Sequence, residues 1–288
     1  MTTAYLNGEY LPLTEARISP MDRGFLFGDG IYEVIPCHQG KPIGFDAHMS
    51  RMREGLAALD IHSGMTPSDW LEVVTALLEK NTSFIPSGYI GVYLHVSRGA
   101  DTRRFHAYPK DISPTLFAFA FELAPPPTPD INKVRPLKVS LAQDKRWQRC
   151  NIKSTSLLGN VMHYQHSHQT GLDETILYNA SNEITEASSC NVFAVIDGKV
   201  VTPPLDHQLL PGITRQIALK ALPEAGIECH ERVLTLEELK GADEVWLTSA
   251  SKEISPVVEI EGQMVADGRP GKRWLQALQA FNQVKFSA

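Results

Sequence analysis

The sequence predicts an α+β protein with two domains. Its 288 residues exceed the usual length of a single domain. A proline-rich stretch at 124–130 offers a boundary, because proline fixes φ and removes backbone donors. Strand and helix patterns lie on both sides of this stretch without the regular alternation of a doubly wound sheet. We therefore expect a small N-terminal domain at 1–123, a linker at 124–133 and a larger domain at 134–288.

The composition indicates a folded, soluble protein. Hydrophobic residues make up 43% of the chain and charged residues 21%, which is ordinary for a globular protein. A net charge of -6 without a basic cluster argues against nucleic-acid binding. The longest apolar run, near 116–121, is too short to span a membrane, and residues 1–10 lack the features of a signal peptide.

The cysteines point to a reducing compartment. They lie far apart and without CxxC spacing, at Cys37, Cys150, Cys190 and Cys229. Such spacing suits free thiols better than a disulfide framework or a zinc site. We therefore expect a cytoplasmic enzyme.

The first domain is expected to be mixed α+β. Its elements are, in order, hairpins at 4–13 and 30–45, helices from 46 and from 66, and strands at 89–96 and 115–122. Asn7-Gly8 suits the tight turn of the first hairpin. Asp46 can cap the first helix, and Thr66 opens the second, which runs through Leu78.

The second domain is expected to combine a strand meander with several helices. Its elements are, in order, a strand at 137–141, a helix at 155–169, strands at 174–178, 183–186 and 192–201, a helix at 214–221, a short helix after Thr235, strands at 244–248 and 257–261, and a helix from 272. The helix at 155–169 carries an apolar stripe that includes Leu158, Val161 and Met162. Thr235 and Glu238 form a capping box.

Lys153 is a candidate catalytic residue because it precedes the expected helix at 155–169. The positive end of a helix dipole disfavours a cation and lowers the pKa of a nearby amine. A lysine that attacks a carbonyl must be neutral, so this position suits Schiff-base chemistry. A solvated loop lysine is the ordinary alternative, and the local sequence alone favours it.

Three other segments match the needs of a pyridoxal phosphate enzyme, which requires a phosphate cup, a carboxylate for the ring nitrogen and a clamp for the substrate carboxylate. The helix start at 212–215 offers backbone N–H groups for a phosphate, although the local sequence favours a plain helix cap. Glu186 ends a strand before small polar residues, and its alternative is an exposed carboxylate. Arg104 and His106 can face one carboxylate, although with Arg103 they also resemble a solvated basic loop.

A metal site is not expected. His163, His166 and His168 lack the spacing of a zinc-binding helix, and no carboxylate motif completes them. The chain also contains no glycine-rich dinucleotide or phosphate loop and no serine-hydrolase elbow.

Taken together, the segments resemble the class IV aminotransferases, the pyridoxal phosphate enzymes of fold type IV. The matching segments follow one another at 22–34, 48–51, 104–106, 147–154, 186–193, 212–215, 248–249 and 253–254. The resemblance implies a small N-terminal α/β domain and a larger C-terminal domain with a barrel-like sheet and flanking helices.

The resemblance also implies roles for individual residues. Lys153 would carry pyridoxal 5'-phosphate as a Schiff base and act in catalysis, and Glu186 would face the pyridine nitrogen. The other implied cofactor contacts are Arg51, Ile213, Thr214 and Ser249 at the phosphate and Leu210 at the ring. The implied substrate-carboxylate contacts are Tyr32, Arg104 and His106, the last two reaching in from the partner subunit of a homodimer.

The implied reaction moves the amino group of a D-amino acid such as D-alanine to a 2-oxo acid such as 2-oxoglutarate, in ping-pong order. Branched-chain L-amino acid aminotransferases and aminodeoxychorismate lyase share the fold and remain alternatives, as does a cofactor-holding protein without turnover. In the resembled family an Arg-x-His pattern marks D-selective enzymes, so its presence at 104–106 implies a preference for D-amino acids. Three features depart from the family pattern: a loop before Arg104 that is one residue longer, Cys190 in place of serine, and Ala250 in place of a hydroxyl residue. The longer loop leaves Arg103 as an alternative to Arg104 for binding the substrate carboxylate.

Overall fold

The computed structural model describes residues 1–287, and its contacts divide this chain into two compact units. The first unit contains Met1–Pro125 and Ile152–Leu157, and the second contains the rest. The division falls inside the proline-rich stretch, between Pro125 and Pro126. The segment Ile152–Leu157, which the sequence analysis kept in the larger domain, makes its contacts in the first unit.

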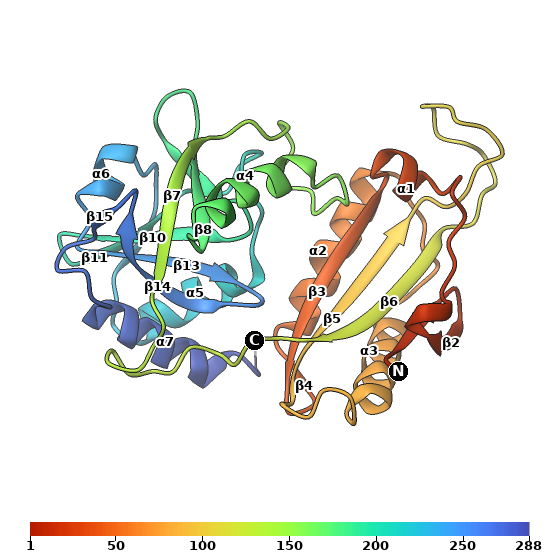
Figure 1. Cartoon of the computed structure of the whole chain (residues 1–288), viewed down its shortest axis with the longest axis horizontal. Helices are drawn as coiled ribbons and strands as arrows, with labels where there is room; N and C mark the ends of the chain where they lie inside the picture. The colour runs from red at the N-terminus through yellow and green to blue at the C-terminus, as the bar shows by residue number, and fades with distance from the viewer. Residues whose placement is uncertain (288) are drawn as a thin grey trace. The chain divides into compact units, whose positions relative to one another are not determined.

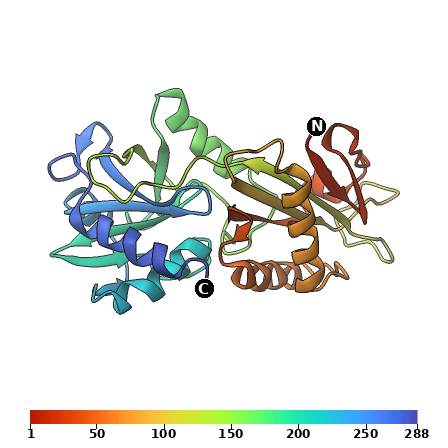
Figure 2. The same ribbon diagram turned by 90° about the horizontal axis from the view of Figure 1, so that it is seen from below.

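The first unit is an antiparallel sheet covered on one face by two helices. Its strand order is β2 (Glu9–Pro12), β1 (Thr3–Leu6), β6 (Thr115–Glu122), β5 (Tyr89–Ser97), β3 (Gly30–His38) and β4 (Lys41–Pro42). The helices α2 (Phe45–Ala58) and α3 (Pro67–Asn81) lie on the same side of the sheet (Figures 1 and 2). Alternate strand residues such as Ile31, Ile35 and Val92 pack against these helices and form the core.

The other face of this sheet carries aromatic side chains. Tyr93 stacks on Tyr32 with ring centroids 5.6 Å apart and lies 5.2 Å from the ring of Phe119. Phe117 and Phe121 continue the row on either side of Phe119. We call these five residues the aromatic face. All of them are half-buried, so both faces of the sheet carry apolar groups.

Local sequence signals explain most of the first unit. Asn7 adopts the left-handed conformation that the tight turn between β1 and β2 requires. Thr66 precedes α3, as expected, and caps it in a capping box with Asp69. The cap at Asp46 is wrong, because Gly44, with a φ of 61°, precedes α2 and Asp46 lies in its first turn. A short helix that was not expected, α1 (Arg23–Phe27), is capped by the side chain of Asp22.

The second unit is built on a mixed, curled sheet. Its strand order is β12 (Cys229–Glu231), β11 (Lys199–Thr202), β10 (Asn191–Ile196), β13 (Glu244–Ser249), β14 (Glu253–Ile260), β7 (Leu137–Gln143), β8 (Glu174–Tyr178) and β9 (Ile184–Ala187), with β15 (Gln263–Met264) beside β14. Residues from β7 through β11 and from β13 and β14 meet in one apolar cluster, so the sheet encloses its own core. The helices α5 (Ile213–Glu224) and α7 (Lys272–Val284) pack against each other and against β13, and α6 (Leu236–Lys240) is short.

Helix α4 (Leu158–Gln169) differs from its expected form in two ways. It begins at Leu158 rather than at 155, because the backbone of the preceding segment pairs with β3 instead of coiling. Its apolar stripe is also not buried in the chain: Leu158 is 73% exposed, Val161 58% and Met162 66%. We call these three residues the α4 stripe.

Within residues 1–287, no helix combines the length and the apolar character that crossing a bilayer requires.

Candidate functional site

Lys153 is held beside the first residues of β3. Ile31 and Ser154 form an antiparallel bridge, and the N–H of Tyr32 donates to the carbonyl of Lys153 at 3.1 Å. The half-buried Lys153 places Nζ 4.1 Å from the centroid of the Tyr32 ring. Strand pairing therefore positions this lysine, not the helix dipole, whose effect fades within one turn of the helix start at Leu158.

Arg51 is fixed by a buried carboxylate. Its Nε and Nη2 donate to the two oxygens of Glu33 at 2.8 and 2.7 Å, and His48 Nδ1 lies 2.6 Å from the same carboxylate. Burial alone would raise the pKa of Glu33, but the charges and hydrogen bonds of Arg51 and His48 lower it to about 2. Glu33 is therefore ionised at neutral pH and holds the Arg51 guanidinium in one orientation.

Glu186, at the end of β9, is almost fully buried among polar partners. Its carboxylate accepts hydrogen bonds from Arg146 Nη1, from the N–H of Leu210 at 3.1 Å and from Asn191 Nδ2 at 3.3 Å. Burial raises the pKa of Glu186 to about 6, although the charge of Arg146 opposes this shift. Arg146 also pairs with Asp144 at 2.7 Å. Arg146 is thus the cation that keeps a buried Glu186 largely ionised at neutral pH.

The N-terminus of α5 lies against Asn191. Gly212 precedes the helix and offers no side-chain cap, and among the described residues nothing accepts from the N–H groups of Ile213 and Thr214. A Cβ at Gly212 would overlap Asn191 Oδ1, so only glycine allows this approach. Uncapped N–H groups at a helix start favour an anion.

Thr248 adds an unused hydroxyl to the same face of the sheet. It pairs with Asn191 across β13 and β10, so the two side chains point to the same side. Its Oγ1 is buried and has no hydrogen-bond partner among residues 1–287. The next residue, Ser249, ends β13 with its hydroxyl accepting from the N–H of Lys252 at 3.1 Å. The donors at α5 and this hydroxyl are those that a phosphate group would take.

Glu174 holds the turn that follows Glu186. Its buried carboxylate accepts from the hydroxyls of Ser188 and Ser189, the latter at 2.5 Å, and lies 3.4 Å from Lys252 Nζ. Cys190 Sγ lies 3.7 Å from the same amine. Cysteine is therefore accommodated here as part of a buried polar cluster.

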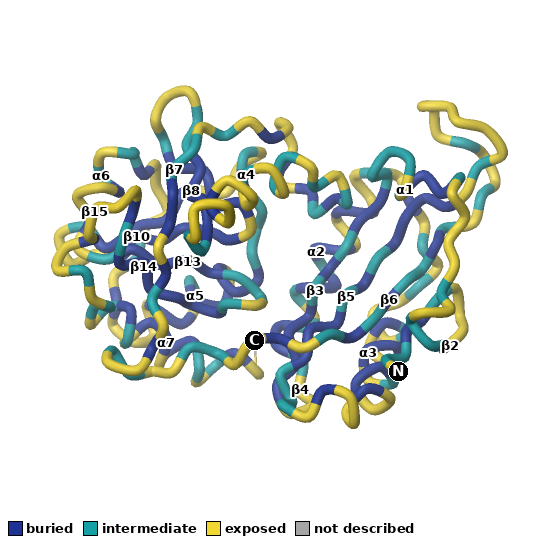
Figure 3. Tube along the Cα trace, in the orientation of Figure 1, coloured by how far each residue is buried: buried dark blue, intermediate teal, exposed yellow. Residues whose placement is uncertain are grey.

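Arg104 and His106 lie in the exposed loop between β5 and β6 (Figure 3). The Arg104 guanidinium lies 5.1 Å from the centroid of the Phe27 ring, and the His106 ring lies 5.4 Å from it. The Arg103 guanidinium instead lies 4.8 Å from the centroid of the Phe105 ring. Arg104, rather than Arg103, therefore shares an aromatic support with His106.

The expected site residues fall into two groups, one in each unit. Lys153, Tyr32, Arg51, Arg104 and His106 belong to the first unit, and Glu186, Leu210, Ile213, Thr214 and Ser249 belong to the second. Leu210 is linked to Glu186 directly and to Asn191, whose Nδ2 donates to its carbonyl at 2.9 Å.

Sequence reasoning missed four polar residues of these groups: Glu33, Arg146, Asn191 and Thr248. All four stood inside or beside the matching segments. Glu33 lies in 22–34, Asn191 in 186–193 and Thr248 in 248–249, and Arg146 directly precedes 147–154. Their positions in or next to the matching segments could have marked them as site residues, but their residue types alone could not.

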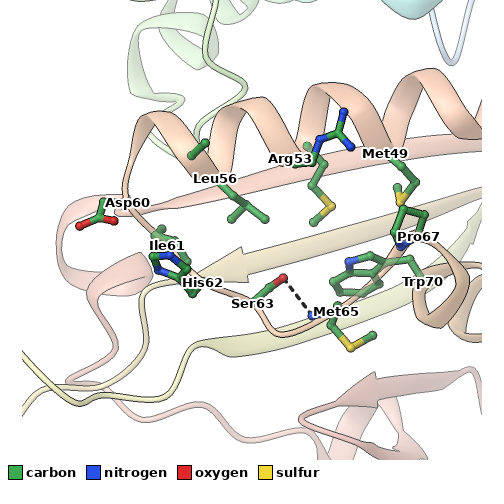
Figure 4. A pocket seen from close by; sticks show the side chains of 12 residues that line it. Met49, Arg53, Leu56, Asp60, Ile61, His62, Ser63, Met65, Pro67 and Trp70 are labelled. Carbon is green, nitrogen blue, oxygen red and sulfur yellow. Dashed lines mark hydrogen bonds between the residues drawn. The ribbon is translucent and has the colours of Figure 1, made fainter.

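A cavity of about 390 Å³ opens under α2 in the first unit (Figure 4). Met49, Leu56, Ile61 and Trp70 form its apolar lining. None of the expected site residues lines it. This cavity is therefore separate from the groups around Lys153 and Glu186.

Comparison with known proteins points to one family. The family model for amino-transferase class IV matches residues 30–260. The chain is 36% identical to a D-alanine aminotransferase from Staphylococcus haemolyticus, covering 98% of this chain and 97% of the relative. It is 34% identical to a D-alanine aminotransferase from Listeria monocytogenes, covering 96% and 93%.

Solved structures share the fold. A branched-chain amino acid aminotransferase from Escherichia coli superposes with a TM-score of 0.88 at 24% identity, covering 98% of this chain and 94% of that one. A hypothetical aminotransferase from Mycobacterium tuberculosis, in its PLP-bound form, gives a TM-score of 0.85 at 16% identity, covering 99% of each chain. The two-domain fold expected from the sequence is confirmed.

Proposed function

This chain belongs to the class IV aminotransferase family, and on that premise we propose that it moves the amino group of a D-amino acid, of the D-alanine type, to a 2-oxo acid such as 2-oxoglutarate. The observation that carries this proposal is the 32–36% identity to D-alanine aminotransferases over nearly the whole chain. The family depends on pyridoxal 5'-phosphate. For an amino transfer between two substrates that use one site in turn, the proposed order is ping-pong.

The described residues fit this cofactor. The uncapped start of α5 and the unpartnered Thr248 hydroxyl suit its phosphate, and we assign Ile213, Thr214, Ser249 and Arg51 to that group. Leu210 is assigned to the ring. When bound, pyridoxal phosphate supplies an electron sink for the charge left at Cα after deprotonation.

Lys153 performs the proton transfers. Its Nζ would hold the cofactor covalently when no substrate is bound. Its amine would also serve as the base that takes the proton from the substrate Cα. Its place beside the Tyr32 ring supports this role, because the ring limits the positions that the amine can adopt.

Glu186 would hold a proton at the pyridine nitrogen of the cofactor. Three donors, from Arg146, Leu210 and Asn191, hold its carboxylate. A carboxylate held in this way stabilises a cationic ring and so lowers the barrier to Cα deprotonation. Tyr32, Arg104 and His106 are assigned to the substrate carboxylate.

We further propose that the enzyme is a homodimer in the cytoplasm, with Arg104 and His106 serving the partner's site. The exposed α4 stripe and the aromatic face support an interface, because apolar groups of this extent favour burial. Four free cysteines support a reducing compartment.

A substrate comparison tests the reaction. Purified protein should convert D-alanine and 2-oxoglutarate to pyruvate, and should do so much faster than it converts L-leucine to its oxo acid. It should release no pyruvate from aminodeoxychorismate when no acceptor is present. Preference for L-leucine would favour the branched-chain alternative, whose solved structures match at 24% identity or less.

A lysine variant tests the assigned chemistry. Lys153→Ala should lose at least about 1,000-fold in kcat, because both the attachment and the base are removed. Borohydride should label Lys153 in the wild-type protein, as read by peptide mass. Near-normal turnover in the variant would contradict the role of Lys153.

A further inference from the structure

Two buried arginines share one carboxylate at the base of the loop that carries Arg104 and His106. Arg23 Nε donates to Asp29 Oδ2 at 2.7 Å, and Arg98 Nε donates to the same oxygen at 2.8 Å. Arg98 Nη2 reaches Oδ1 at 3.0 Å. Burial alone would raise the pKa of Asp29, but the hydrogen bonds and charges of the two arginines hold it below its usual value. Both guanidinium groups are therefore fixed by an ionised partner.

Arg23 uses its remaining donors on the loop backbone. Its Nη1 donates to the carbonyl of Phe105 at 2.6 Å and reaches that of Ala107 at 3.4 Å, and its Nη2 donates to that of His106 at 3.1 Å. Arg23 is buried, whereas the loop side chains at 104–107 are exposed. The buried guanidinium of Arg23 thus binds three consecutive backbone carbonyls of an otherwise exposed segment.

Arg98 fixes the start of the same loop and also contacts Tyr108 further along it. It stands directly after β5, where its guanidinium donates to the carbonyls of Leu59 at 2.6 Å and Asp60 at 2.9 Å. The same guanidinium lies 3.4 Å from the ring centroid of Tyr108. The loop is therefore clamped at its start, through its centre and at residue 108.

We propose that Arg23 is a positioning residue for the substrate carboxylate: its contacts with the backbone at 105–107 fix the presentation of Arg104 and His106. The inference rests on the proposed function, in which those two side chains bind that carboxylate. Phe27 completes the arrangement, because Arg23 and Arg104 both lie within about 5 Å of its ring, at 4.8 and 5.1 Å.

The chemistry of arginine explains why the position needs this residue. A guanidinium has five N–H donors in a rigid plane, so it can bind Asp29 and the carbonyls together. A lysine offers a single ammonium, which satisfies Asp29 but cannot span three carbonyls. The Arg23→Lys variant therefore keeps the buried charge balance and removes the backbone clamp.

The first test separates substrate binding from chemistry. In Arg23→Lys, KM for D-alanine should rise at least tenfold with kcat changed less than threefold. The half-reaction with D-alaninamide, which lacks a carboxylate, should keep its wild-type rate when followed by cofactor absorbance. Arg53→Gln, at an exposed position on α2, is the matched control and should leave both substrates unchanged.

The second test measures how accessible the loop is to a protease, without any need for turnover. In the holoenzyme without substrate, trypsin should cut after Arg103 and Arg104 at least fivefold faster in Arg23→Lys than in the wild type, as measured by mass spectrometry. Arg53→Gln should be cut there at the wild-type rate. Faster cutting with unchanged melting temperature shows local release of the loop.

The outcomes distinguish this inference from the proposed function. Unchanged KM together with unchanged cutting would overturn the positioning role. An equal loss for D-alanine and D-alaninamide would also overturn it, because it would mean a general structural defect. A wild-type protein inactive on D-alanine would contradict the proposed function, while the cutting experiment would still report on the clamp.

Discussion

Single residues near Glu186 show how a buried acid is kept ionised. Burial raises the pKa of Glu186 to about 6, and the charge and hydrogen bond of Arg146 oppose this rise. Arg146 is itself buried and pairs with both Asp144 and Glu186. In our assignment, the proton at the pyridine nitrogen would therefore depend on Arg146, a residue that does not contact the ring.

Replacing Arg146 with glutamine should impair chemistry in a pH-dependent manner. Without the cation, the pKa of Glu186 rises above about 6, so more of it is protonated at neutral pH. We expect kcat for D-alanine to fall roughly 10- to 100-fold at pH 7, with partial recovery at higher pH. The measurement is the pH profile of kcat, which in the wild type should decline only below about pH 6.

Arg146→Lys provides the control, because it keeps the positive charge and loses the planar guanidinium. The acid limb of its kcat pH profile should lie near that of the wild type. If Arg146→Gln has the same acid limb as the wild type, Arg146 does not set the ionisation of Glu186.

The sequence predicted Lys153, Glu186 and Arg51 through the family pattern, but not their partners. Glu33 and Arg146 are ordinary charged residues in the sequence, and only the fold shows that both are buried in pairs. Burial of a charge depends on contacts between distant segments, which residue type and spacing do not specify.

Elements were predicted best where the signal is local. The helix start at Thr66 and the capping box before α6 formed as expected, because capping hydrogen bonds span only three residues. The predicted start of α4 was wrong, because residues 153–155 pair with a strand more than 100 residues earlier in the chain. The helical period of the α4 stripe was correct, but a period does not say which surface covers it.

The α4 stripe predicts an interface at the element scale. Met162→Glu places a charge within exposed apolar side chains, which is tolerated by a monomer and disfavoured in an apolar interface. We expect the variant to shift from dimer to monomer, as measured by size-exclusion chromatography with light scattering. Activity on D-alanine should fall at least tenfold, because Arg104 and His106 are assigned to the partner's site.

Met264→Glu is the matched control, since Met264 is similarly exposed, at 62%, on β15. It should remain dimeric and active. A dimeric Met162→Glu protein would exclude the α4 stripe from the interface.

At the scale of the whole molecule, neither unit holds all the residues that our proposal assigns to the reaction. The first unit carries Lys153, Tyr32 and the Arg104–His106 loop, and the second carries Glu186 and the uncapped start of α5. The proposal adds a further division, between subunits, because the loop serves the partner's site. This division can be tested by mixing two inactive chains.

One chain carries Lys153→Ala with an intact loop, and the other carries Arg104→Gln and His106→Gln with an intact lysine. Random reassociation of a dimer gives about half heterodimers, and each heterodimer holds one complete site. Activity on D-alanine at low substrate should therefore recover to about one quarter of the wild-type value. A mixture of Lys153→Ala and Lys153→Arg should recover none. If the loop instead serves the lysine of its own chain, no heterodimer holds a complete site, and the first mixture stays as inactive as its parents.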